Sequence, residues 1–127
     1  MKIEVREGLP YVTTKLTYHG KTITLENVVV DTGSASTLFR TDDLLRLGIA
    51  FAADDVVEQV RGVGGVETVV AKRIESITVG DLRLVNFAVD MSVMNYGFAI
   101  DGLLGFDFLQ QTGAVIDLSV MEIRASG

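Results

Sequence analysis

The 127-residue chain has no cysteine and no tryptophan, and only one proline and one histidine. Without cysteine it forms no disulfide and offers no thiolate to a metal or a substrate. The single histidine, His19, lies in "TYHGK", where a hairpin turn and a solvated side chain are expected. One histidine leaves little from which to build a zinc site or a histidine-assisted nucleophile. These absences exclude most hydrolase chemistries, and we expect neither a metal nor a cofactor.

The chain also lacks any cluster of basic residues. It has 11 Lys and Arg against 17 Asp and Glu, a formal net charge of −6. That balance argues against nucleic acid or an anionic membrane as a partner. Apolar runs such as Val28–Val30 are too short to cross a bilayer, and "MKIEVREGLP" lacks the apolar centre of a secretion signal. We therefore expect no membrane segment and a cytoplasmic location.

What the chain does contain is typical of a folded globular protein. Hydrophobic residues make up 48% of it and charged residues 22%. A chain of this length folds as one domain that buries about two-thirds of the surface exposed by the unfolded chain. No linker or low-complexity tract interrupts the sequence, so we expect a single domain over residues 1–127.

Short runs of alternating or apolar residues predict a mainly β protein. The predicted strands are 12–18, 22–25, 28–30, two arms of a hairpin within 56–70 of which the second continues through 74–79, then 82–91, a short apolar strand before "GLLG", and a final strand over 114–125. A short helix follows Thr41, its expected N-cap, and ends at Gly48. A second helix is expected around Asp107–Gln111 with Gly113 as its stop. Many short strands and one or two short helices favour a closed or nearly closed sheet.

The most informative stretch is "VVVDTGSAS", residues 28–36, in which an apolar strand ends on a carboxylate. Gly33 permits a sharp turn and offers an unhindered N–H near Asp31. Thr32 and Ser34 supply hydroxyls that can hold and orient the carboxylate. Alone, D-T-G is a weak signal, because aspartates at strand ends are usually caps or turn formers. Two further features strengthen it: the glycine-rich hairpin "RGVGG" and the turn "GLLG" that opens a helix.

In these three features and in their order the chain resembles the retropepsin-like aspartic proteases, over roughly residues 10–118. The resemblance implies a closed acid-protease barrel with Asp31 as the catalytic residue, supported by Thr32, Gly33 and Ser34. It implies a flap that closes over substrate, with its tip at Arg61, Gly62, Val63, Gly64 and Gly65. It also makes Leu103, Leu104 and Gly105 the scaffold of the active-site loop. A hairpin without function is the alternative interpretation of the glycines.

Hydrolysis of an amide by water alone needs a general base and a general acid together. Two carboxyl groups about 3 Å apart provide both, because they cannot both ionise and so share one proton. The chain has a single D-T-G. Asp101, in "IDGLLG", is the only rival for a second carboxylate within the chain, and we interpret it as structural or as the rim of the cleft. The second catalytic aspartate is therefore expected from another copy, in a homodimer.

The resemblance predicts a role for Ser34, and the chain departs from the retroviral members at two positions. A hydroxyl at Ser34 can donate to the carboxylate and favour its charged form, which predicts activity at acidic pH. Retroviral members pair an Asp and an Arg near the dimer interface, and the matching positions here are Ala35 and Phe106. Their absence predicts an interface that relies more on apolar contact.

Two functions remain open at this stage. The first is an endopeptidase that acts on extended polypeptides. The second is an inactive dimerisation or peptide-binding module with the same fold. An intact D-T-G favours the enzyme, since a binding module gains nothing from two close carboxylates. The apolar cluster Met91, Met94, Tyr96 and Phe98 could line a substrate pocket, although such a cluster is more often core.

Overall fold

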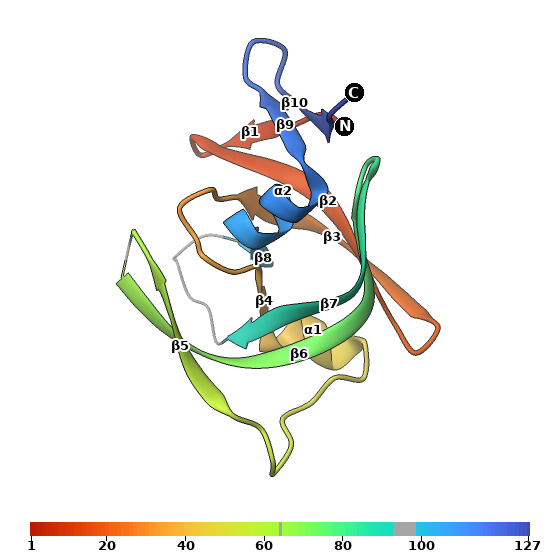
Figure 1. Ribbon diagram of the computed structural model, residues 1–127, viewed down its shortest axis with the longest axis vertical. Coiled ribbons are helices and arrows are strands. Elements are labelled where there is room, and N and C mark those ends of the chain that lie inside the picture. Colours follow the sequence, from red (N-terminus) through yellow and green to blue (C-terminus); the bar gives the residue numbers. More distant parts are fainter. Residues whose placement is uncertain (64, 93–98) are drawn as a thin grey trace.

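The computed structural model describes residues 1–63, 65–92 and 99–127 (Figure 1). Its strands and helices are β1 (Glu4–Arg6), β2 (Leu9–Tyr18), β3 (Lys21–Val30), β4 (Leu38–Arg40), α1 (Thr41–Arg46), β5 (Val57–Gly62), β6 (Gly65–Val79), β7 (Leu82–Ser92), β8 (Gly102–Leu104), α2 (Phe106–Thr112), β9 (Ala114–Asp117) and β10 (Glu122–Ala125). The predicted mainly β fold with two short helices is confirmed. Within the described residues, neither helix is long and apolar enough to cross a membrane.

Six strands close into a ring. They are hydrogen-bonded in the order β2, β3, β8, β4, β7 and β6, and a further pairing joins β6 back to β2. That closing contact is antiparallel and runs from Lys15, opposite Thr78, to Thr17, opposite Ser76. Two neighbours are parallel, β3 with β8 and β4 with β7. The predicted closed sheet is confirmed, and among the strands of the described residues closure leaves β1 and β5 at its edges.

The interior of the ring is filled by the inward side chains of its strands. Leu16, Phe39, Ile74 and Ile77 are almost completely buried, because alternate residues of each strand point to the same face. Phe108 of α2 packs into this core and is also fully buried. Met91, the first member of the predicted apolar cluster, is buried core. Met94, Tyr96 and Phe98 lie outside the described residues.

The sequence pattern predicted two strands where the structure has one. Residues 22–25 and 28–30 were expected as separate strands, but β3 is continuous from Lys21 to Val30. Its pairing with β2 shifts register between Val12 and Thr14, so an irregularity accommodates the polar residues Glu26 and Asn27 without ending the strand. The predicted turn before it is confirmed, with positive φ at His19 and Gly20.

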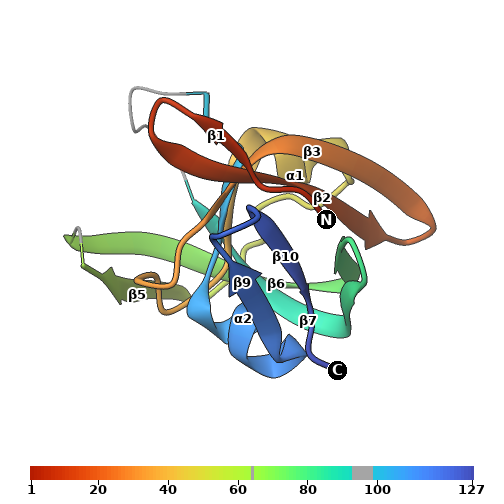
Figure 2. The same cartoon turned by 90° about the horizontal axis from the view of Figure 1, so that it is seen from above.

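In the C-terminal run, the sequence pattern predicted one strand where the structure has two. One final strand was expected over 114–125, but β9 and β10 form an antiparallel hairpin. The Asp117 carboxylate accepts hydrogen bonds from the Ser119 N–H at 3.0 Å and from its hydroxyl, which turns the chain. β10 lies beside the N-terminus, since the Ile123 N–H of β10 donates to the Met1 carbonyl at 2.9 Å (Figures 1 and 2).

Helix α1 begins one residue earlier than expected. Arg40, not Thr41, occupies the N-cap position and provides no side-chain cap, whereas the Thr41 hydroxyl donates to the Ser92 carbonyl at 3.4 Å. Gly48 follows the helix with φ +86°, and its N–H donates to the Leu45 carbonyl. Gly113 ends α2 in the left-handed conformation at φ 63°, as predicted.

Candidate active site

Asp31 lies where β3 leaves the barrel. The last residues of β3 pair in parallel with β8, and the Asp31 N–H continues this ladder by donating to the Leu104 carbonyl at 3.0 Å. Val28, Val29 and Val30 are buried between their neighbours, whereas the Asp31 side chain is half-buried at the surface of a loop. Its Oδ1 accepts the Gly33 N–H at 2.9 Å. The apolar strand therefore fixes the position of a carboxylate that stays accessible to solvent.

The segment Leu103–Leu104–Gly105 holds the same loop from the other side. Beyond it, the Phe106 N–H donates to the Ser34 carbonyl at 2.8 Å. The Gly105 N–H donates to the Thr37 hydroxyl oxygen at 3.0 Å, and that hydroxyl donates to Asp107 at 2.7 Å. These bonds join the start of α2 to the loop that carries Asp31.

The Ser34 hydroxyl does not point where the sequence suggested. Ser34 is buried, and its hydroxyl donates to the Ser36 carbonyl at 2.7 Å. A hydroxyl has one proton to donate, so this bond removes it from Asp31. The expected donation from Ser34 to the carboxylate is wrong in this chain, so Ser34 gives no reason to expect activity at acidic pH. Ser34 instead stabilises the turn of the loop.

The hairpin of β5 and β6 reaches over this loop. Gly62 forms an isolated antiparallel bridge with Ser34, and Val63 at the tip is 94% exposed. A side-chain methyl of Val63 would lie 3.2 Å from a Cβ added to Gly33, so the tip covers the glycine beside Asp31. Gly64 lies outside the described residues. A hairpin without function, the alternative interpretation of these glycines, would not require this contact with the D-T-G loop.

Two hollows open beside the loop. The first, of about 180 Å³, is lined by Asp31 of the loop, Leu38 and Leu103 of the barrel, and Val60, Val66 and Glu67 of the hairpin. The second, of about 390 Å³, lies between Thr32, Ala35, Arg61, Val63 and Phe106. Phe106 is 49% exposed there. The structure thus brings the predicted loop, the tip of the hairpin and the start of α2 to one face.

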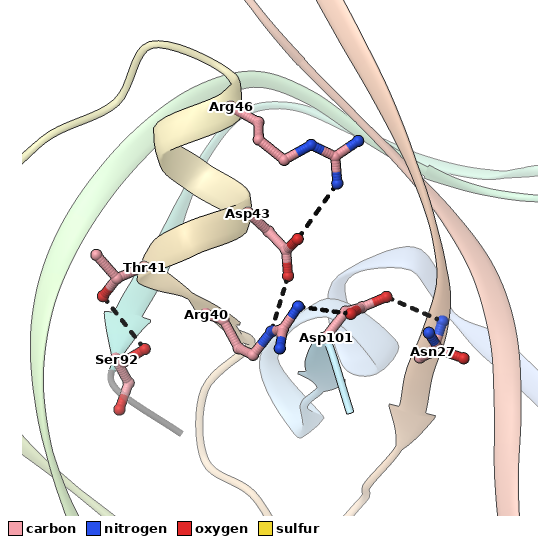
Figure 3. A network of polar contacts seen from close by, with 7 residues as sticks. All are labelled: Asn27, Arg40, Thr41, Asp43, Arg46, Ser92 and Asp101. Atoms are coloured by element: carbon pink, nitrogen blue, oxygen red, sulfur yellow. Dashed lines mark hydrogen bonds and ion pairs between the residues drawn. The ribbon is translucent and has the colours of Figure 1, made fainter. Parts of the chain in front are cut away.

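Asp101 belongs to a separate polar network (Figure 3). Its carboxylate accepts from Arg40 at 3.1 Å and from the Asn27 N–H at 3.3 Å. Arg40 also donates to Asp43 at 3.0 Å, and this hydrogen bond raises the pKa of Arg40 above its ordinary value. Asp43 accepts a further bond from Arg46. These contacts fix β3, β4 and β8 to one another and favour the structural interpretation of Asp101. In the described part of the chain, no His, Asp and Glu side chains gather to hold a metal ion.

Sequence reasoning missed another acid, Asp90 of β7. It is buried where β7 runs beside β4, and its N–H donates to the Thr37 carbonyl at 2.9 Å. Burial raises the pKa of the Asp90 carboxyl, and the negative charges of Glu58 and Asp107 act in the same direction. The run "NFAVDMS" gave one signal, a charged residue among apolar ones in a predicted strand.

Asp90→Asn is expected to stabilise the protein at neutral pH. The folded state holds the Asp90 proton more tightly than the unfolded chain, so the free energy of unfolding falls as pH rises from 3.8, the ordinary value, through the raised pKa. The amide has no charge to bury, so the variant lacks this loss. Urea unfolding between pH 3 and 8 should show a gap that grows with pH. An equal gap at every pH, or the same gap in the exposed control Asp54→Asn, would contradict this account.

Comparisons with known proteins agree with this geometry. A family model described as aspartyl protease matches residues 14–108, which include the D-T-G loop, the hairpin and the start of α2. The crystal structure of a retropepsin-like aspartic protease from Rickettsia conorii superposes with a TM-score of 0.64 at 18% identity, over 97% of this chain and 95% of that one. No curated protein matches the chain. The predicted retropepsin-like fold is confirmed.

Proposed function

The chain belongs to the aspartyl protease family, and on that premise we propose that it is an endopeptidase whose active site forms between two copies. The observation that carries the proposal is the setting of Asp31. A buried strand delivers this carboxylate to an accessible loop, the Gly33 N–H orients it, and the tip of a hairpin contacts the loop beside it. One chain supplies one such aspartate, and a two-fold axis supplies its mate.

The chemistry follows from the two carboxyl groups. At about 3 Å apart they share one proton, because two negative charges at that distance repel strongly. The ionised group takes a proton from water, and the protonated group donates to the scissile carbonyl. Water then adds to the carbonyl carbon and gives a gem-diol. As the gem-diol collapses, the C–N bond breaks, the proton taken from water passes to the amine that leaves, and one hydroxyl proton returns to the other carboxylate, which restores the shared proton. The Gly33 N–H keeps one Asp31 oxygen in place.

The neighbouring residues take supporting roles in this proposal. Thr32 is exposed beside Asp31 and is available to bind the backbone of the partner's loop. The tip, Arg61 to Gly65, excludes water and offers backbone groups to an extended peptide, which it binds as an added strand. Leu103, Leu104 and Gly105 keep the loop in register through the Asp31 to Leu104 bond.

Digestion of casein between pH 4 and 7, with and without pepstatin, tests the proposal. The expected result is cleavage that pepstatin abolishes, from a protein that light scattering finds dimeric at micromolar concentration. Equal digestion in both tubes would indicate a contaminating protease of another class. A monomer that binds peptides without cutting them would favour the binding-module alternative.

Phe106→Asp is expected to weaken the dimer. Phe106 is 49% exposed beside Thr32 and Ala35, on the face that must meet the second copy. A buried aromatic anchor contributes about 2 kcal/mol or more to such an interface, so the dissociation constant should rise by about thirtyfold or more. Sedimentation measures it. Phe51→Asp is the matched control, because Phe51 is 55% exposed and does not line that hollow. Equal effects of both variants would place the interface elsewhere.

A further inference from the structure

Asp90 lies behind the loop that carries Asp31. It is the direct neighbour of Leu38 in the parallel pairing of β7 with β4, and paired residues of adjacent strands point to the same face of a sheet. Leu38 lines the hollow of Asp31, whereas Asp90 is only 7% exposed and is not among the described residues that line it. The Asp90 carboxyl group is therefore buried beside the candidate site, out of reach of a substrate.

Two contacts connect Asp90 to the loop of Asp31. Its N–H donates to the Thr37 carbonyl at 2.9 Å. Its carboxyl group faces the Ser36 hydroxyl, which favours the charged form of the acid. That hydroxyl is buried, and among the described residues it has no partner at full hydrogen-bond geometry. Because the Ser36 carbonyl accepts the Ser34 hydroxyl, a movement of Ser36 reaches the turn that follows Asp31.

The groups around Asp90 mostly oppose its charge. Burial has the largest effect and disfavours the carboxylate, and the Ser36 hydroxyl acts against it. Two further acids disfavour the carboxylate as well, Glu58 of β5 and Asp107 at the start of α2. Together these groups raise the pKa of the Asp90 carboxyl above 3.8, its ordinary value.

The neighbouring strands provide no positive charge to offset these effects. Leu38 of β4 and Ala71 of β6 lie directly beside Asp90, and both are uncharged. The cations of the surrounding strands are engaged elsewhere or lie at the surface: Arg40 pairs with Asp43 and Asp101, Lys72 pairs with Asp55, Arg73 donates to the Asn86 carbonyl, and Arg61 is exposed near the hairpin tip. Within the described residues, an ionised Asp90 thus faces a neutral hydroxyl and no cation.

The proton of Asp90 decides how well this packing is satisfied. A neutral carboxyl group can donate to the Ser36 oxygen, which gives both buried groups a partner. An ionised one is a buried charge without a counter-charge, and that is costly. The cost falls if β7 moves away from the loop and water reaches the carboxylate. Such a movement strains the bond from the Asp90 N–H to Thr37 and displaces the loop.

We propose that Asp90 is a positioning residue that holds the loop of Asp31 in its active conformation while it carries a proton, and releases the loop when it ionises. This inference rests on the proposed function, since it adds a control by pH to the same site. It gives Asp90 no part in proton transfer to the substrate. It also supplies a cause for activity at acidic pH that Ser34 does not.

An NMR titration of Asp31→Asn between pH 3 and 8 tests this control without proteolysis. The substitution removes the titration of Asp31 itself, so the amide signals of Gly33 and Ser36 report on other groups. They should shift with the same midpoint as the side-chain carbon of Asp90, above pH 3.8. Adding Asp90→Asn should abolish that step. Adding Glu58→Gln should move it to lower pH, because a like charge is removed. Loop signals that do not follow Asp90, or that keep the step in Asp90→Asn, would overturn the inference.

The pH profile of kcat/KM tests the consequence for catalysis. The measured quantity is the ratio of activity at pH 7 to activity at pH 4.5. Asp90→Asn should raise this ratio by up to about tenfold, the effect of moving the apparent pKa of the alkaline limb by about one unit. Glu58→Gln should lower the ratio, and the exposed control Asp54→Asn should keep it.

The ratio separates positioning by charge from simple support of the fold. If Asp90 only packed β7 against the loop, Asp90→Asn would change activity equally at both pH values, and an unchanged ratio would refute the proposed role. If the wild-type protein cleaves nothing at any pH, the proposed function fails. The NMR titration then decides whether the charge of Asp90 controls the loop.

Discussion

Asp31→Asn is expected to lose proteolytic activity by a factor of about 10³ to 10⁴, with the fold and the dimer unchanged. The amide cannot accept the proton of water, yet it has the shape of the carboxylate and can still accept the Gly33 N–H. The loss should therefore appear in kcat, and the free energy of unfolding should stay close to that of wild type. Progress curves with a peptide substrate and urea unfolding measure the two quantities.

The same variant tests whether two chains share the site. When wild-type protein is mixed and re-equilibrated with a fivefold excess of Asp31→Asn, random pairing leaves about one sixth of the wild-type chains in wild-type dimers. Activity should fall to that fraction, because mixed dimers lack one carboxylate. The same excess of Asp54→Asn should instead raise total activity about sixfold, since Asp54 is exposed and outside the site and every dimer that forms keeps both Asp31 carboxylates. Activity that ignores the excess of Asp31→Asn would mean that a single chain is sufficient.

Gly105→Ala is expected to destabilise the fold by about 3 kcal/mol or more, the cost of strong overpacking. A Cβ at Gly105 would overlap the carbonyl of Ser36, and backbone cannot rotate away as a flexible side chain can. The loop of Asp31 would have to separate from the start of α2, which would break the bond from the Phe106 N–H to Ser34. Urea unfolding, or loss of soluble protein, measures the effect.

Gly62→Ala is the matched control for this prediction. Its added Cβ would lie 3.4 Å from the Gly33 carbonyl oxygen, an ordinary contact, so its unfolding free energy should change by less than about 1 kcal/mol. Similar losses in both variants would mean that flexibility of glycine, rather than the close approach at Gly105, decides stability.

The parts of the fold that the sequence predicted depend on local signals. Alternation gave β2, β6 and β7, and glycines marked the turns at Gly20, Gly80 and Gly113, each with positive φ. The polar pair Glu26–Asn27 led to the wrong prediction of a break in β3, because a polar interruption looks like the end of a strand until the partner strand is known. In the C-terminal run the apolar alternation continued through the turn at Asp117, although Asp-Leu-Ser carried a turn signal.

The parts that could not be predicted depend on distant contacts. The Ser34 hydroxyl has one proton to donate, and the Ser36 carbonyl and the Asp31 carboxylate compete for it. The turn of the loop decides for Ser36. The tie between Arg40 and Asp101 joins residues 61 positions apart. Glu67 reads as a surface residue of an exposed hairpin until the hollow under the hairpin is seen. The D-T-G motif located the candidate site, but its lining comes from five segments of the chain.

The insertion of β8 between β3 and β4 bears on how the protein is made. β8, residues 102–104, lies in the sheet between β3, which ends at Val30, and β4, which begins at Leu38. The backbone partner of Asp31, the Leu104 carbonyl, is therefore synthesised long after Asp31 itself. A nascent chain leaves the ribosome from its N-terminus, and it cannot complete this loop until most of its length has emerged. Translation order alone therefore delays the assembly of the site.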